Sequence, residues 1–259
     1  WIPVPIPFLR SAPGADRKKG MGTGIHHAGW SERLSALKCK WFYSWTPKIP
    51  ERIPEGTEYF PMIPSYGGNK DLIAKAGASA KAAGIGELLG FNEPDQLRQA
   101  NMTVEQALDA WPLLEESGLR LGSPACAHAD GDWMKAFMAG VKKRRLRVDF
   151  VCVHNYGGPD AVHFLSHLSN VQRLFRKPLW ITEFAVGDWQ AKTPEHNRHK
   201  PETVLKFMEN VLPRLQRMDF IERYAWFPAA RTSAPLGTSA PFNDDSTLTR
   251  LGARYRDLA

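Results

Sequence analysis

The sequence has little cysteine and no long apolar run. Its three cysteines, Cys39, Cys126 and Cys152, are too few and too far apart for a disulfide framework, and no CxxC pair indicates a metal knuckle or a redox site. We interpret them as core thiols. Because no apolar segment reaches the roughly 18 residues that a bilayer-spanning helix needs, the 259 residues are expected to form a soluble globular protein without a membrane partner.

The sequence also lacks a starting methionine, since its first residue is Trp1. We therefore expect that an upstream segment preceded this residue, and a secretory signal peptide is one candidate for it. On this interpretation the protein is secreted and acts outside the cell.

Positive charge exceeds negative charge: 34 Lys and Arg against 27 Asp and Glu give a net charge of +7, which raises the question of an anionic partner. The densest basic run is KKRRLR at 142–147. It falls at the end of an expected helix, where cations complement the helix dipole. No helix-turn-helix, RNP or zinc-finger pattern accompanies it, so no nucleic-acid partner is predicted.

Short apolar runs alternate with longer stretches of helical period, a pattern typical of βα units around a parallel sheet. The runs start about 20 to 45 residues apart, the length that a strand, a helix and two loops require. The expected strands are residues 20–25, 41–45, 59–64, 88–91, 120–123, 150–154, 179–182 and 224–227. No linker divides the chain, so the sequence predicts an α/β protein in which residues 1–259 form one domain, a single (β/α)8 TIM barrel.

The segments between these runs also carry helix signals. Thr103 and Gln106 form an S/T-x-x-E/Q capping box, and Pro201 begins a long apolar stripe in a favourable first-turn position. Residues 46–58 contain three prolines, so the crossover between the second and third strands is expected to be reduced, without a proper helix. The main alternative is a doubly wound open sheet, but the glycines of GMGTG at 20–24 lack the spacing of a dinucleotide-binding loop.

Two glutamates follow apolar runs directly. Glu93 lies at the end of the fourth expected strand and Glu183 at the end of the seventh. Burial penalises a charged carboxylate, so such positions usually have a partner or a task. Glutamates three strands apart can face each other across a barrel mouth, the arrangement required for retaining glycoside hydrolysis, in which one carboxyl is the acid and the other the nucleophile, about 5 to 5.5 Å apart.

These motifs carry a resemblance to a known family. The segments concerned are WFYSW at 41–45, GFNEP at 90–94, KPLWITEFAVGDW at 177–189, ERYAWF at 222–227 and LTRLG at 248–252. Together they resemble glycoside hydrolase family 128, within the larger clan of retaining (β/α)8 glycosidases. The resemblance implies endo-hydrolysis of β-1,3-glucan with retention of anomeric configuration. We further expect a monomer that needs neither a cofactor nor a metal. The alternatives are another specificity in the same clan, such as mannan or xylan, and a carbohydrate-binding barrel that has lost catalysis.

The resemblance also implies roles for individual residues. Glu93 would be the general acid and base, and Glu183 the nucleophile. Asn92 would hydrogen-bond the 2-hydroxyl of the reacting sugar. His154 and Tyr156 resemble the clan's polar pair near the nucleophile, where a hydroxyl donor could keep the carboxylate ionised.

The nine tryptophans exceed the six tyrosines, and indole rings can stack on sugars. We expect Trp45, Trp189 and Trp226 to line substrate subsites on the catalytic face. Trp111 and Trp133 lie on or at the start of amphipathic stripes, so we expect them to pack between helix and barrel. Alternation along the seventh strand places Trp180 on the face opposite to Glu183, so we expect it to pack beneath the helices.

One possible metal-binding pattern remains. His163 and His167 lie four residues apart on an expected helix and could in principle chelate a metal. Because neither a carboxylate nor a third histidine stands in the same motif, a solvated helix face is the favoured interpretation, and no metal site is predicted.

Overall fold

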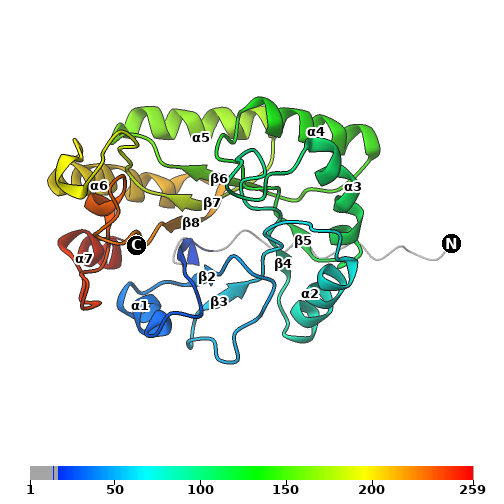
Figure 1. Ribbon diagram of the computed structural model, residues 1–259, viewed down its shortest axis with the longest axis horizontal. Coiled ribbons are helices and arrows are strands. Elements are labelled where there is room, and N and C mark those ends of the chain that lie inside the picture. The colour runs from blue at the N-terminus through cyan, green and yellow to red at the C-terminus, as the bar shows by residue number, and fades with distance from the viewer. Residues whose placement is uncertain (1–13, 15–16, 259) are drawn as a thin grey trace.

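The computed structural model describes residue 14 and residues 17–258, in which parallel strands form a central ring surrounded by helices (Figure 1). The predicted domain spans 1–259, so residues 1–13, 15–16 and 259 of it, Trp1 included, lie outside the described part. The strands are β1 (Lys19–Gly22), β2 (Trp41–Tyr43), β3 (Glu58–Phe60), β4 (Glu87–Leu88), β5 (Arg120–Leu121), β6 (Val151–Asn155), β7 (Leu179–Phe184) and β8 (Ile221–Trp226). All eight overlap the predicted runs.

The strands follow one another around a barrel. Six form a hydrogen-bonded sheet in the order β3-β2-β1-β8-β7-β6, and β4 pairs with β5 in a second sheet. Single parallel bridges, Met62 with Leu89 and Gly122 with Phe150, connect these two sheets on both sides. The ring is thereby completed, and the predicted (β/α)8 barrel is confirmed.

Helices connect the strands and cover the ring. They are α1 (Trp30–Ala36), α2 (Lys70–Ala82), α3 (Val104–Glu115), α4 (Asp132–Arg144), α5 (Ala161–Phe175), α6 (Pro201–Arg217) and α7 (Arg250–Asp257), with 3-10 turns at Pro194–His196 and Gly237–Ser239. Residues 44–57, all of them described, contain no helix, so the reduced crossover between β2 and β3 is as predicted. Thr103 and Gln106 form the predicted capping box at the start of α3.

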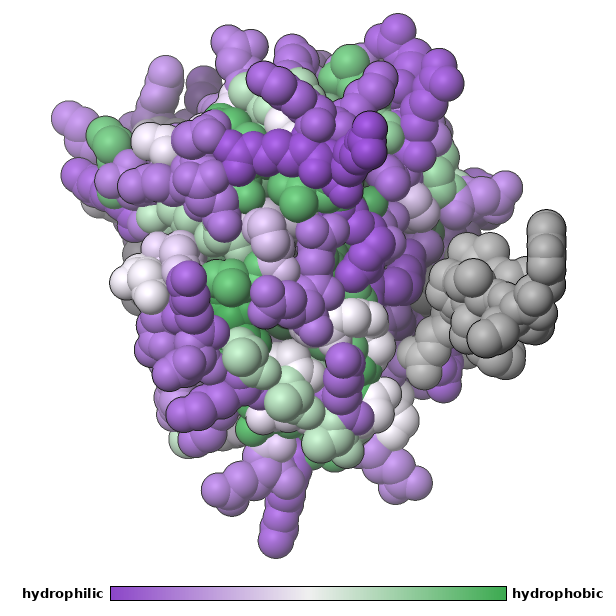
Figure 2. Space-filling model, turned by 90° about the vertical axis from the view of Figure 1, so that its right-hand side faces the viewer, coloured by the Kyte–Doolittle hydropathy of each residue, from purple (hydrophilic) through white to green (hydrophobic). Residues whose placement is uncertain are grey.

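One outer face of the barrel is mostly polar. Seen from the side of α2, α3 and α4, the molecule presents mostly hydrophilic side chains (Figure 2). The basic run ends α4 as predicted, and Arg144 in its last turn forms ion pairs with Glu105 and Asp109 of α3. No helix among the described residues is long and apolar enough to cross a membrane.

Apolar side chains form two layers, one between strands and helices and one inside the barrel. Trp111 and Trp133 belong to the outer layer, as predicted, and both pack on Phe137 of α4. The cysteines are unpaired and buried, which agrees with their interpretation as core thiols. The inner layer consists of Trp41, Tyr43, Phe60, Met62, Leu89, Ala125, Phe150, Cys152, Trp180 and Ala225.

The prediction for Trp180 is wrong, because this side chain points into the barrel rather than toward the helices. Its ring stacks on Phe150 at 4.2 Å between centroids, and its Nε1 donates to Glu222 Oε2 at 2.7 Å. Strict alternation would place Trp180 and Glu183 on opposite faces. A register shift adds one residue, Thr182, between them, and this bulge returns both to the inner side.

Two glycines of β1 make room for the aromatic side chains of the neighbouring strand. A Cβ atom on Gly20 would lie 2.3 Å from the ring of Trp41, and one on Gly22 would lie 3.1 Å from the rings of Trp45 and Tyr43. The alternating glycines of β1 therefore serve packing in the barrel, not phosphate binding. Through Trp45 and Tyr43, Gly22 also shapes the site described below.

We predict that Gly20→Ala lowers the free energy of unfolding by about 1–3 kcal/mol, because the added methyl group overpacks against Trp41. Urea denaturation measures the change. Gly67→Ala is the matched control, since a Cβ atom there meets no heavy atom within 4 Å. Equal stability of the two variants would contradict this account of β1.

Candidate active site

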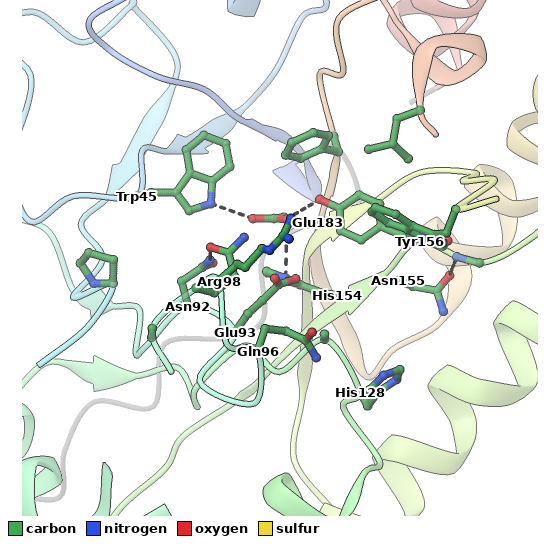
Figure 3. Close-up of a pocket in the computed structure, with 18 of the residues that line it drawn as sticks. Trp45, Asn92, Glu93, Gln96, Arg98, His128, His154, Asn155, Tyr156 and Glu183 are labelled. Atoms are coloured by element: carbon green, nitrogen blue, oxygen red, sulfur yellow. Dashed lines mark hydrogen bonds and ion pairs between the residues drawn. The ribbon is translucent and has the colours of Figure 1, made fainter. Parts of the chain in front are cut away.

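A cleft of about 1240 Å³ opens at the carboxyl ends of the strands. It is lined by residues from the loops after β2 to β8, and both predicted glutamates lie at its centre (Figure 3). This is the end of a (β/α)8 barrel at which active sites are built. Of the predicted site residues, the cleft brings together Trp45, Asn92, Glu93, His154, Tyr156, Glu183 and Trp189.

Glu93 has an unusual backbone conformation. Its φ angle is 42°, in the left-handed region that non-glycine residues seldom adopt. The Glu93 N–H donates to the carbonyl of Ala125 at 2.8 Å, and that of the preceding Asn92 donates to Pro64 at 2.8 Å, so neighbouring strand ends hold the segment in place. Strain of about 1–3 kcal/mol at such a position is typical of functional sites.

Glu183 owes its orientation to the bulge in β7. On the neighbouring strand Val153 pairs with Ile181 and His154 pairs with Glu183, so Thr182 is the extra residue. The bulge turns the carboxylate into the cleft beside His154. Sequence alternation alone could not reveal this, because a bulge changes the face of every later side chain.

Three donors hold the Glu183 carboxylate. Tyr43 OH and Trp45 Nε1 donate to Oε1 at 2.8 and 2.7 Å, and Tyr156 OH donates to Oε2. Burial, followed by the charge of Glu183, raises the pKa of Tyr43 and Tyr156 well above the ordinary tyrosine value. Both phenols therefore keep their protons and remain donors. Tyr43 was missed by the sequence reasoning, although it lies two residues before Trp45 and hence on the same face of the strand.

The two carboxylates are close together. One oxygen of Glu93, one oxygen of Glu183 and a ring nitrogen of His154 all lie within 4.8 Å of one another. Inverting glycosidases need carboxyl groups about 6.5–9.5 Å apart to admit a water molecule, whereas retaining ones need about 5–5.5 Å. The observed spacing has no room for that water and fits direct attack by a carboxylate.

His154 connects the two glutamates. Its Nδ1 lies 2.9 Å from Glu93 Oε1 and 3.5 Å from Glu183 Oε2, and its side chain is buried. Burial disfavours the imidazolium, but the charges of Glu183, Glu93 and Asp95 outweigh it and raise the pKa of His154 above its ordinary value. A proton on this ring reduces the repulsion between the carboxylates.

Asn92 points into the cleft beside Glu93. Its Nδ2 donates to Gln99 Oε1 at 3.3 Å, while its Oδ1 is buried and has no hydrogen-bond partner among the described residues. A buried acceptor without a partner costs free energy. The Asn92 amide therefore has an open position that a ligand hydroxyl could fill.

The prediction that Trp226 lines the cleft is wrong. Its side chain is 1% exposed and packs outward against Phe184 and Phe207. Side chains of β8 alternate, and Ala225 faces the barrel interior, so Trp226 faces the helices. The next inward position is Phe227, which lines the cleft and was missed. Trp189, in contrast, is 65% exposed at the edge of the cleft.

We predict that the pKa of His154 lies above 6.5 in the folded protein and falls in Glu183→Gln, because the substitution removes a neighbouring negative charge. NMR titration of the imidazole resonances measures both values, and His154→Gln identifies the signal. Since the folded pKa is raised, the stabilising contribution of the protonated ring is complete below pH 6.5 and is lost as the pH rises through the folded value. An unchanged pKa in Glu183→Gln would contradict the coupling.

Comparison with known proteins gives a consistent assignment. The family model described as "Glycosyl hydrolase catalytic core" matches residues 23–255. A family 128 (subgroup I) endo-β-1,3-glucanase from Amycolatopsis mediterranei, solved in complex with laminaritriose, is 33% identical, with a TM-score of 0.80 over 94% of this chain and 100% of that chain. A subgroup II endo-β-1,3-glucanase from Sorangium cellulosum is 26% identical, with a TM-score of 0.77 over 93% and 98% of the two chains.

A curated protein is also related to this chain. Alkali-sensitive linkage protein 1 of Schizosaccharomyces pombe is 27% identical over 239 residues, which cover 88% of this chain. The match takes up only 42% of that protein, so this chain spans less than half of its length. With the family model and the solved relatives agreeing, the chain belongs to the glycosyl hydrolase catalytic core family and to glycoside hydrolase family 128.

Proposed function

We propose that this chain hydrolyses β-1,3-glucan at internal linkages with retention of anomeric configuration. The observation that carries the mechanism is the spacing of Glu93 and Glu183, whose carboxylates approach within 4.8 Å. The substrate class rests on the relatives, which are described as endo-β-1,3-glucanases, one of them with laminaritriose bound. The cleft is open and is lined by residues that follow seven of the strands, which supports action within a chain.

In the first step, Glu183 is the nucleophile. One of its oxygens bonds to the anomeric carbon as the bond from that carbon to the leaving sugar breaks. Glu93 gives its proton to the departing oxygen, so the leaving sugar departs as a neutral alcohol. The donors Tyr43, Trp45 and Tyr156 fix the direction of attack because they leave the Glu183 carboxylate a single orientation.

In the second step, Glu93 is the base. It takes a proton from water as the water oxygen bonds to the anomeric carbon, and the ester bond to Glu183 breaks. Both carboxyl groups return to their starting forms, and the configuration is inverted twice. We assign Asn92 to the 2-hydroxyl of the reacting sugar, supported by its buried Oδ1 without a partner among the described residues.

Other features of the proposal concern the whole protein. We propose that the chain is a single catalytic domain, that it acts as a monomer, and that it acts outside the cell. The single domain is supported by the order of elements, since the barrel runs continuously from β1 to α7 in the described residues. Action outside the cell is proposed because a polymeric glucan is too large to cross a membrane unaided.

We predict that the wild type releases short oligosaccharides from laminarin, with little product from xylan, mannan or cellulose. Glu183→Gln should remove nearly all turnover while the protein stays folded, because an amide cannot form the ester. Glu93→Ala should lose about 10²- to 10⁴-fold in rate, since it removes the general acid. Size-resolved product analysis and circular dichroism measure these effects.

Azide distinguishes the two glutamates. With 4-nitrophenyl β-laminaribioside, whose phenolate leaves without a general acid, azide added to Glu93→Ala should restore part of the rate and yield a β-glycosyl azide, because it attacks the glycosyl ester in place of activated water. An α-glycosyl azide would mean inversion and would overturn the mechanism. Preferred cleavage of xylan, mannan or cellulose would instead retain the mechanism and replace the substrate.

We also predict that Trp189→Ala raises the Kd for laminari-oligosaccharides in Glu183→Gln by about tenfold, equivalent to about 1.4 kcal/mol, with little change in melting temperature. Its ring is exposed, stands edge-on to Tyr156 and offers a face to a sugar. Trp226→Ala is the control, since deleting a buried tryptophan typically costs about 3–5 kcal/mol of stability. Calorimetry gives both values, and the opposite ranking would assign Trp189 to packing.

A further inference from the structure

The two sides of the cleft differ in chemistry. Around Glu183, four rings form a continuous aromatic side in the order Trp45, Phe227, Tyr156 and Trp189, with centroid separations of 6.1, 5.4 and 6.0 Å. Trp45 and His128 lie on opposite sides of the two glutamates (Figure 3). A part of the substrate that lies toward His128 therefore contacts a surface other than this aromatic side.

That surface is a cluster of titratable side chains, which we name the histidine bay. It consists of His128 and Asp130, in the segment between β5 and α4, and of His163 and His167 on α5. Asp130 Oδ2 accepts from Asn170 Nδ2 at 3.2 Å and lies 3.5 Å from His167 Nδ1. All four members of the bay line the same cleft as the two glutamates, and His128 and His163 are exposed in it.

The bay was not predictable from sequence. His163 and His167 lie one helical turn apart, and the third histidine and the carboxylate that their motif lacks come from a separate segment of the chain. Yet the bay is not arranged around one ion. Among the described residues, the only group of three whose ligand atoms lie within 4.8 Å of one another is Glu93, His154 and Glu183. The polar groups of the histidine bay are instead spread along the wall of the cleft, an arrangement that suits recognition of several hydroxyl groups.

The connection to Glu93 gives the bay its place in the reaction. Asp95, two residues after Glu93, accepts from the N–H groups of Ala127 and His128 at 2.9 and 3.2 Å. These hydrogen bonds connect the loop that carries Glu93 to the loop that carries His128. In the proposed mechanism the anomeric carbon lies at Glu183 and the leaving oxygen lies at Glu93, so the leaving sugar extends to the side of Glu93.

We propose that the histidine bay is the leaving-group subsite of this cleft and binds glucose hydroxyls by hydrogen bonds rather than by ring stacking. The inference rests on the function proposed above. Asp130 is an acceptor for hydroxyl protons, and neutral imidazoles offer one donor and one acceptor each. Burial lowers the pKa of His167, Asp130 raises it, and His163 and His128 lower it further, so the pKa lies below the ordinary histidine value and the neutral ring is favoured.

The experiment compares two substrates that differ in the leaving group. In laminarihexaose the leaving group is a glucan, whereas in 4-nitrophenyl β-laminaribioside it is a phenol. For the double variant His128→Ala, His163→Ala we expect kcat/KM for laminarihexaose to fall about tenfold relative to kcat/KM for the aryl glycoside. This is the effect of losing one or two hydrogen bonds. The control is His26→Ala, His27→Ala, which removes two exposed histidines after β1 that do not line the cleft.

A second measurement does not depend on turnover. Laminarihexaose is titrated into Glu183→Gln, and the imidazole resonances of His128 and His163 should shift while those of His26 and His27 should not. Equal losses on both substrates, or no shift of the bay resonances, would overturn the inference. If the wild type cleaved laminarin but one of these two contrary results were found, the proposed function would stand and the inference about the histidine bay would fall. If the wild type cleaved no laminarin but the bay resonances shifted, the bay would bind glucan in a barrel that lacks the proposed activity.

Discussion

The site depends on holding two carboxylates within 4.8 Å of each other at a largely buried barrel mouth. Whenever both groups are ionised, as after Glu93 has given up its proton, their like charges repel, and burial strengthens the repulsion because the local dielectric is low. The protein offsets it by placing His154 between them and by surrounding Glu183 with three donors, Tyr43 in β2, Trp45 just after it and Tyr156 just after β6. The same arrangement gives the two glutamates different surroundings. Glu183 is enclosed by donors, whereas Glu93 stands on a strained loop and faces the open cleft.

The rest of the barrel provides the space for this arrangement. Gly22 of β1 lies beside Tyr43 and Trp45, the two donors to Glu183, and a Cβ atom there would lie 3.1 Å from their rings. The bulge at Thr182 aims Glu183 at the same point from the opposite side. Packing inside the barrel and chemistry at its mouth are therefore continuous. A substitution in β1 can reach the nucleophile through two aromatic side chains.

Much of the fold and the centre of the site could be predicted from the sequence, because parallel strands are short apolar runs and their ends share one edge. The eight strands, the missing helix between β2 and β3, and the meeting of Glu93 with Glu183 all follow from this local pattern. The errors have a single physical origin. Trp180 and Trp226 were assigned to the wrong faces because side-chain direction depends on register, and one inserted residue or a miscounted alternation reverses it.

The sequence by itself determined which catalytic side chains are present and at which strand ends they lie, because both depend on residues that are close together in the chain. Only the tertiary structure decided which groups surround them. The hydrogen bond from Tyr43 to Glu183, the contacts of Phe227 with Trp45 and Tyr156, and the pairing of His167 with Asp130 each join residues far apart in the chain. Such contacts depend on how the strands close into a ring and on how the loops pack, and a linear pattern does not record those distances.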